Sequence, residues 1–197
     1  MDFTPDTALI VVDLQNDFAL PTGGLYVRGG QEVVAVVNEY VAAAETAGSP
    51  VFYTQDWHPA VTAHFAKDGG VWPVHCVAGT WGAELVADLR VVGPVVRKGV
   101  DGEDGYSGFS VRDPASGQIH ATRLGSLLTE AGVRRLVVTG LAGDVCVAET
   151  ALDGIRLGYE VVVPLVATRF VELEPGDGER AVARMTAAGA QVPLAGP

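Results

Sequence analysis

Runs of apolar residues alternate along the chain with stretches in which apolar residues recur at helical spacing. The continuous apolar run Ala8–Val12 is typical of a strand that is buried on both faces of a parallel sheet. Comparable runs predict further strands at Pro50–Thr54, Pro94–Arg97, Leu136–Val138 and Glu160–Pro164. Strands that alternate with helices predict an α/β fold: a three-layer, doubly wound, mostly parallel sheet of five or six strands with helices on both faces.

The segments between these runs place apolar residues three and four positions apart, as in helices that bury one face. The longest is Gln31–Ala47, and the glycine that follows it, Gly48, is a C-cap signal. The same spacing predicts helices at Ala83–Leu89, Thr122–Ala131, Val147–Leu157 and Gly178–Ala188. A short edge strand is expected at Gln191–Pro193.

Two long segments have no clear periodicity. Ala60–Thr80 is rich in His, Trp, Gly and Pro, and Asp101–Gly117 contains four glycines. Loops of this length inside a compact domain usually have a function. Because no linker or low-complexity tract divides the chain, residues 1–197 are expected to form a single domain.

The composition argues against several functional classes. The chain is 48% hydrophobic and 19% charged, and no apolar run reaches the about 18 residues of a transmembrane helix. A formal net charge of −11 argues against nucleic acid or an anionic membrane as partner, because both require clustered Lys and Arg. The first residues show no signal-peptide pattern, and two cysteines are too few for a disulfide framework. We therefore expect a cytoplasmic protein.

Chemically active side chains follow the predicted strands. Asp13 follows the first strand, Asp56 and His58 follow the second, Lys98 follows the third, and Cys146 lies beyond the fourth, where a helix begins. In a parallel sheet these carboxyl ends share one edge, and ligands bind there. These residues are therefore expected to form an active site.

Cys146 is the candidate nucleophile of this site. A helix N-terminus favours the thiolate, which is the nucleophilic form of cysteine, and its N–H groups can bind an oxyanion. Asp13 can take the thiol proton and return it to a leaving group, and Lys98 can hold the carboxylate and stabilise the thiolate. The alternatives are a buried cysteine that packs as a small apolar residue, a capping aspartate and a solvated lysine.

Histidines cluster beyond the second strand. Asp56-x-His58 is followed by His64 and His75, so that three of the four histidines fall within eighteen residues. Mixed carboxylate and imidazole ligands suit Zn²⁺, Fe²⁺ or Mn²⁺ and leave positions for water or substrate. The alternative is a set of surface histidines in a polar loop. The aromatic residues Phe18, Trp57 and Trp72 either line a pocket for a flat ring or belong to the core.

Several motifs match a known family. They are Val12–Phe18, Thr54–Pro59, Trp72–Glu84, Lys98–Gly99, Tyr106–Phe109 and Thr139–Val147, and they keep the family's order and spacing from about residue 8 to 165. On these residues the chain resembles the isochorismatase-like cysteine hydrolases, and within them the nicotinamidases (pyrazinamidases). It departs from the family at Pro164–Phe170, which lacks the acidic-Ala type of sequence that many relatives have after the fifth strand.

The resemblance implies roles for individual residues. It implies a catalytic triad of Asp13, Lys98 and Cys146, a cis peptide bond between Leu141 and Ala142, and an oxyanion held by the N–H groups of Ala142 and Cys146. It implies one divalent metal ion, with zinc expected before iron or manganese. The implied metal ligands are Asp56, His58 and His75, with His64 as a further ligand in some members. The implied aromatic pocket positions are Phe18 and Trp72.

The implied reaction is the hydrolysis of nicotinamide to nicotinate and ammonia, a step of NAD salvage. Cys146 attacks the amide carbon, Asp13 protonates the leaving ammonia, and water releases the acyl thioester. The expected partner is a small aromatic amide, and the sequence leaves a homo-oligomer open. One alternative is another amidase of the superfamily, for a ureido, carbamoyl or maleamate-type substrate, although such relatives generally lack the Asp-x-His metal set. A non-catalytic ligand-binding member and a redox protein using Cys76 and Cys146 are further alternatives.

Overall fold

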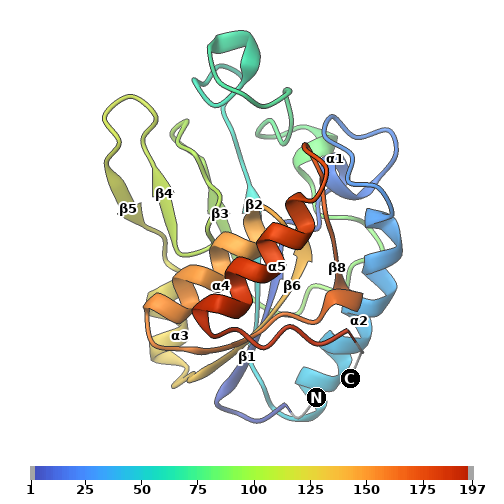
Figure 1. Ribbon diagram of the computed structural model, residues 1–197. Coiled ribbons are helices and arrows are strands. Elements are labelled where there is room, and N and C mark those ends of the chain that lie inside the picture. Colours follow the sequence, from blue (N-terminus) through green and yellow to red (C-terminus); the bar gives the residue numbers. More distant parts are fainter. Residues whose placement is uncertain (1–2, 195–197) are drawn as a thin grey trace.

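The computed structural model describes residues 3–194, and a parallel six-stranded sheet runs through the middle of this region (Figure 1). The hydrogen-bonded order is β3-β2-β1-β6-β7, and β8 pairs with the carboxyl end of β6. Every pairing in this sheet is parallel. The strands are β1 Thr7–Val12, β2 Val51–Asp56, β3 Val95–Lys98, β6 Arg135–Leu141, β7 Glu160–Val162 and β8 Thr168–Arg169. The predicted fold class is confirmed.

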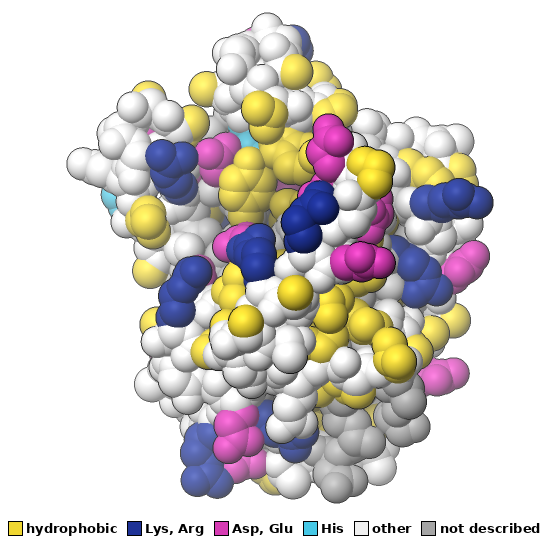
Figure 2. All heavy atoms as spheres, in the orientation of Figure 1, with side chains coloured by type: hydrophobic (Ala, Val, Ile, Leu, Met, Phe, Trp, Pro, Cys, Tyr) yellow, Lys and Arg dark blue, Asp and Glu magenta, His cyan; other side chains and the backbone are white. Residues whose placement is uncertain are grey.

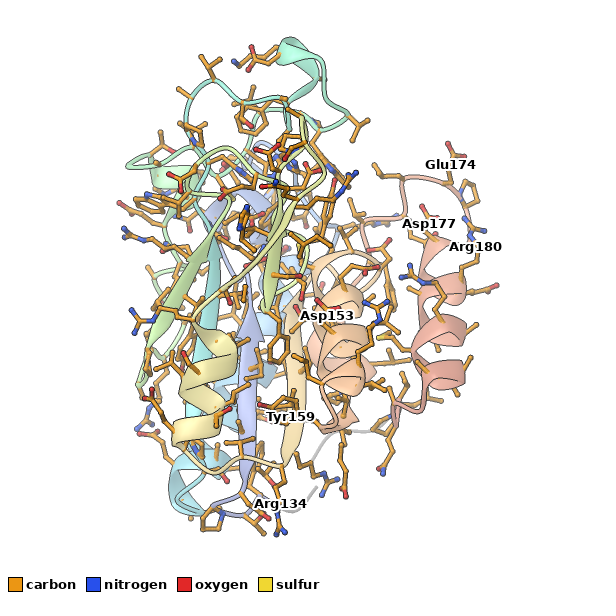
Figure 3. All side chains as sticks on the ribbon, turned by 90° about the vertical axis from the view of Figure 1, so that its left-hand side faces the viewer. Arg134, Asp153, Tyr159, Glu174, Asp177 and Arg180 are labelled. Atoms are coloured by element: carbon orange, nitrogen blue, oxygen red, sulfur yellow. The ribbon has the colours of Figure 1, made fainter. Side chains whose placement is uncertain are left out.

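Helices cover both faces of the sheet. Alternate residues of β1 point to opposite faces, and both sets are apolar and must be buried. Leu9 and Val11 belong to one apolar core, which α2 covers, whereas Ala8, Ile10 and Val12 belong to another, which α3, α4 and α5 cover. Figure 3 shows α5 outside α4, with the paired side chains of Asp177 and Arg180 at its first turns. The helices are α1 Asn16–Ala19, α2 Gly30–Thr46, α3 Leu124–Glu130, α4 Cys146–Arg156 and α5 Asp177–Ala188. Three short 3-10 turns lie at Ala66–Asp68, Trp81–Ala83 and Leu165–Ala167.

Most predicted elements are present, with boundaries shifted by a few residues. The strand predicted at Pro50–Thr54 extends to Asp56, which pairs with Lys98 at the end of β3. Gly48 follows the long helix with a φ of +69°, as expected for a C-cap glycine. The predicted edge strand near the C-terminus reduces to a single parallel bridge between Val162 and Gln191. Across residues 3–194, no helix has both the length and the apolar character needed to cross a membrane.

The helix predicted at Ala83–Leu89 is wrong. This segment starts in the 3-10 turn Trp81–Ala83, forms a single antiparallel bridge from Leu85 to Gln15, and then enters a turn closed by the Leu89 N–H and the Val86 carbonyl. The N–H of Val86 donates to the carbonyl of Leu14 at 2.9 Å, and the carbonyl of Ala83 accepts from the Gln15 side chain at 2.9 Å. Because these backbone groups are bonded to a distant part of the chain, they are not free to form a helix.

The loop predicted at Asp101–Gly117 contains strand β4, Ser110–Arg112, which pairs antiparallel with β5, Ile119–Ala121. The turn between them is held by Asp113, whose carboxylate accepts backbone N–H bonds from the two residues at 115 and 116. Strands of three residues are too short to show an alternating pattern. The hairpin lies apart from the main sheet (Figure 1).

The sheet order places a topological switch point between β1 and β6. From β1 the chain proceeds outward to β2 and β3 on one side, and from β6 to β7 on the other. Ligands of open α/β sheets bind in the crevice beyond the strands at such a point. Gly140 permits the close approach of the two central strands, because a Cβ there would lie 2.0 Å from the Val12 carbonyl oxygen. The ends of β1 and β6 therefore open into one crevice.

Candidate active site

Lys98 is buried among the side chains that the strand ends supply. Its Nζ lies 2.7 Å from Asp13 Oδ2 and 3.7 Å from Cys146 Sγ. It also donates to Asp56 Oδ1 and to the carbonyl oxygen of Gly105. Although burial favours the neutral amine, the two carboxylates raise the pKa of Lys98 well above its usual value, so it remains an ammonium. The three residues predicted as a triad meet at this ammonium group.

Asp13 is held in place by the neighbouring strand. It adopts a φ of +46° directly after β1, and the hydroxyl of Thr54 donates to Asp13 Oδ1 at 2.7 Å. Burial raises the pKa of the Asp13 carboxyl, although Lys98 acts in the opposite direction. A carboxylate with a raised pKa is better suited to accept a proton and return it. A carboxylate oxygen of Asp13 lies within 4.8 Å of Cys146 Sγ, so the two groups are close enough for proton exchange.

Cys146 is the first residue of α4 and is buried. Burial raises the pKa of its thiol well above the usual value, Lys98 lowers it, and Asp13 and Asp56 raise it further. Burial and the two carboxylates thus outweigh the helix N-terminus, which the sequence predicted would favour the thiolate. The structure thus gives the Cys146 thiol a raised pKa and places it beside a lysine and two carboxylates.

The turn before Cys146 has the backbone that the resemblance implies. The Leu141–Ala142 peptide bond is cis. The carbonyl of Ala142 accepts from the N–H of Val147 at 3.0 Å, which ties the turn to the first turn of α4. Both Ala142 and Cys146 line the same pocket. The N–H of a first helical residue has no acceptor within its helix, so it is available for an oxyanion.

Three buried histidines face one another beside the triad. Ring nitrogens of His58, His64 and His75 lie within 4.8 Å of each other. Asp56 Oδ2 is 3.7 Å from His58 Nε2 and 3.8 Å from His75 Nε2. Within residues 3–194, neither ring nitrogen of His58 has a hydrogen-bond partner, although the residue is fully buried. Since unpaired buried polar groups are costly, these residues fit a metal ion, and the donor set suits Zn²⁺, Fe²⁺ or Mn²⁺.

The rings of His75 and His64 are each oriented by a hydrogen bond at Nδ1. His75 Nδ1 lies 2.7 Å from the Pro73 carbonyl oxygen, and His64 Nδ1 lies 2.7 Å from Asp104 Oδ1. Burial lowers the pKa of His75 to about 4 and also lowers the pKa of His64. Both rings are therefore neutral at pH 7, as metal ligands must be.

Asp56 joins the triad to the histidine cluster. One carboxylate oxygen accepts from Lys98, and the other faces His58 and His75. Although burial acts against it, the charge of Lys98 holds the pKa of the Asp56 carboxyl below its usual range. Gln15 fixes the Asp56 backbone, because its side chain accepts the Asp56 N–H and donates to the Asp56 carbonyl, both at 2.8 Å.

A pocket of about 400 Å³ opens above Cys146 and reaches the histidines. Figure 2 shows hydrophobic side chains gathered beneath the loop at the top of the view, which is the loop of residues 60–80 in Figure 1. The indole N–H of Trp72 donates to the hydroxyl of Tyr106 at 2.9 Å. The lining side chains beside the catalytic and histidine groups are aromatic or aliphatic: Phe18, Leu25, Val27, Trp72, Tyr106, Val145 and Val171.

The structure separates the three aromatic candidates. Phe18 and Trp72 are among the residues that line the pocket, and Trp57 is not. The Trp57 ring instead contacts Arg97, whose guanidinium carbon lies 3.7 Å from the ring centroid. Several supporting residues were missed by the sequence argument, although most lie within or beside its motifs. They are Gln15, Thr54, Asp104, Gly105 and Tyr106.

A buried cysteine beside a carboxylate and a lysine, at the switch point of a parallel sheet, is the arrangement of a cysteine hydrolase. The histidine cluster and the apolar pocket adjoin that group. The chain belongs to the isochorismatase family, because the Isochorismatase domain model matches residues 7–194.

Relatives of known structure or activity resemble the chain over almost its full length. It is 36% identical to a nicotinamidase of Escherichia coli (strain K12) over 204 residues, which cover 94% of this chain and 93% of that protein. The structure of a Pyrococcus horikoshii pyrazinamidase in complex with zinc superposes with a TM-score of 0.85 at 37% identity, covering 95% of this chain and 98% of the other. The L. infantum protein PnC1 in complex with nicotinate superposes with a TM-score of 0.86 at 34% identity, and the match covers 98% of this chain and 94% of that protein.

Proposed function

We propose that this protein is a nicotinamidase, a cytoplasmic amide hydrolase that converts nicotinamide to nicotinate and ammonia in NAD salvage, with residues 1–197 as one catalytic domain. The observation that carries the proposal is one pocket whose wall contains both Cys146 and the histidines His64 and His75. A substrate bound there can present its amide to the cysteine and its ring to the histidine cluster. The names of the relatives, a nicotinamidase and a protein bound to nicotinate, support this substrate.

The residues around Cys146 supply a covalent route. As Cys146 Sγ attacks the amide carbon, its proton passes to Asp13, and the N–H groups of Ala142 and Cys146 hold the oxyanion. Asp13 then protonates the amide nitrogen, the C–N bond breaks, and ammonia leaves an acyl thioester. Asp13 next takes a proton from water, whose oxygen attacks the thioester carbon. As the C–S bond breaks, Asp13 returns this proton to the departing sulfur, which restores the thiol, and the acid released ionises to nicotinate. Lys98 keeps Asp13 in place and offsets its charge.

A divalent metal ion would be held by residues of the histidine cluster, and we propose zinc before iron or manganese. The proposed ligands are His58, His75 and Asp56, with His64 as a further ligand. When bound, such an ion supplies a Lewis acid that can bind a pyridine ring nitrogen. The zinc in the name of the Pyrococcus horikoshii pyrazinamidase supports this choice. Phe18 and Trp72 would hold the flat ring between the metal site and the cysteine.

The pocket wall favours a neutral aromatic amide over an acidic substrate. Ureido and maleamate-type acids carry a carboxylate, and recognition of a carboxylate typically uses Arg or Lys. Within residues 3–194, no Arg or Lys belongs to the pocket lining, and Lys98 lies below it with its charge already offset by Asp13 and Asp56. The other amidase activities of the superfamily are therefore the weaker candidates.

Ammonia release from nicotinamide by the zinc-loaded protein tests the proposal. We expect turnover by the wild type and a loss of at least about a thousandfold in Cys146→Ala, because a missing nucleophile removes the covalent route. Cys76→Ala is the matched control and should remain active, since Cys76 is buried in the core and lines no part of the pocket. No activity in the metal-loaded wild type, or faster hydrolysis of maleamate or a ureido acid, would refute the proposed substrate.

A further inference from the structure

His64 and His58 differ in what surrounds their rings. His64 Nδ1 lies 2.7 Å from Asp104 Oδ1, and their side chains are only 4% and 15% exposed. His58, by contrast, finds no hydrogen-bond partner for either ring nitrogen in the part of the chain that the structure describes. Asp104 has no part in the triad or in the proposed metal ligand set, and it comes from a different loop, 40 residues further along the chain. A partly buried carboxylate aimed at one histidine of this cluster requires an explanation.

The backbone around Asp104 is held from several sides. Its N–H donates to the Arg112 carbonyl at 2.8 Å, and the Arg112 N–H donates to its carbonyl at 2.9 Å, so the β4–β5 hairpin anchors it. The carbonyl of the next residue, Gly105, accepts from Lys98. The hydroxyl of Tyr106 accepts from the Trp72 indole. The Asp104 carboxylate is therefore fixed relative to the triad and the pocket.

An imidazole ring needs such a partner to act as a ligand in one orientation. A neutral ring carries one proton, which can sit on either nitrogen. An ionised carboxylate at Nδ1 retains that proton there and leaves the lone pair on Nε2. Because Nδ1 of His64 faces Asp104, its Nε2 is turned away from that carboxylate, and His64 groups with His58 and His75.

We propose that Asp104 is a positioning residue that fixes the tautomer and ring orientation of His64 and so makes His64 the fourth metal ligand in this protein. The proposal rests on the metal site of the proposed function. Asp104 contacts neither the metal nor the substrate, and it acts only through His64. Its carboxylate also increases electron density on the ring, which strengthens the bond from Nε2 to a metal ion.

Zinc affinity of the metal-free protein, measured by competition with a chromophoric chelator, tests this role. Loss of an outer carboxylate partner typically weakens metal binding by about 10–100-fold. We expect a loss in this range for Asp104→Ala and a smaller loss for Asp104→Asn, which keeps a neutral acceptor and most of the shape. Glu103→Gln is the matched control and should bind like the wild type, because Glu103 accepts only from the Asp101 N–H.

A double-mutant cycle separates positioning from a general effect on the fold. In a His64→Ala background, Asp104→Ala should cause no further loss of zinc affinity, since the residue through which it acts is absent. An equal loss in both backgrounds, or wild-type affinity in both Asp104 variants, would overturn the positioning role while leaving the metal site intact. A wild type that does not bind zinc would instead overturn the proposed metal site, and the role of Asp104 with it.

Discussion

Replacing Lys98 with methionine is the most demanding test of how the buried charges are balanced. The substitution keeps the length of the side chain but removes the ammonium that faces Asp13 and Asp56. All three side chains have at most 6% of their surface exposed, so water cannot replace the lost contact. Two buried carboxylates then remain without their cation.

The expected loss of stability follows from this burial. Removing one partner of a buried ion pair costs about 3–5 kcal/mol, because the remaining charge is left uncompensated. Lys98 contacts two carboxylates and one carbonyl, which would increase the loss. The loss is reduced because the desolvation cost of the ammonium disappears with it and because the carboxylates can take up a proton. We therefore expect Lys98→Met to lose about 3–5 kcal/mol of the free energy of unfolding at pH 7, a large part of the about 5–15 kcal/mol of a typical domain.

The loss should depend on pH with a definite sign. In the wild type, Lys98 holds the pKa of Asp56 below its usual range, so this stabilisation is present above the unfolded pKa of about 3.9 and is lost as the pH falls. In Lys98→Met, burial without a cation raises both carboxyl pKa values, so that stability is lost as the pH rises through the raised values. The raised carboxyl pKa values of the variant therefore make the difference between variant and wild type shrink from pH 7 towards pH 4, and the loss of the Asp56 stabilisation in the wild type adds to this only near and below pH 4.

Urea unfolding of the metal-free proteins at pH 7.5 and 4.5 measures this difference. Lys67→Met is the matched control, because the chain has no other lysine and Lys67 is 43% exposed in its pair with Asp68. Exposed pairs contribute about 0–1 kcal/mol, so this control should be nearly neutral. Adding Asp13→Asn to Lys98→Met should recover part of the loss. A loss below about 1 kcal/mol at pH 7.5, or a difference that grows as the pH falls, would refute the reasoning.

Two other substitutions test the histidine cluster and the pocket. Burial lowers the pKa of His75 to about 4, so the metal-free wild type should lose stability as the pH falls from about 6.5 through that value. Urea midpoints of His75→Asn should vary less over this window, and an unchanged pH profile would contradict the explanation. Trp72→Phe loses the hydrogen bond to Tyr106, worth about 1 kcal/mol; we expect KM for nicotinamide to rise severalfold with little change in kcat. A fall in kcat alone would contradict a role in substrate binding.

The sequence was most informative where local pattern and sheet topology act together. The apolar run before Asp13 can be buried only as a central strand, and all six residues of β1 are buried. Because parallel strands end at one edge, Asp13, Lys98 and Cys146 were expected to meet there, and the strand ends do bring them together. This part of the site was predictable because it depends on strand positions and not on side-chain details.

Prediction failed where distant contacts replace local structure. The segment Ala83–Leu89 has helical spacing, but its backbone bonds to Leu14 and Gln15 instead. The hairpin Ser110–Ala121 has strands too short for a periodic signal, so only its turn residue Asp113 indicated structure. In both cases the deciding hydrogen bonds join residues that no sequence window contains.

The sequence by itself determined the order of the central strands and of the helices that cover them, the residues at the strand ends and, through its motifs, the family. Tertiary structure alone decided how these groups are charged and paired. It placed Asp56 between Lys98 and the histidines, turned His64 towards Asp104, and buried Cys146, which raises the pKa of its thiol. The physical reason is that a pKa and a side-chain orientation depend on burial and on neighbours brought close by folding, neither of which a linear pattern records.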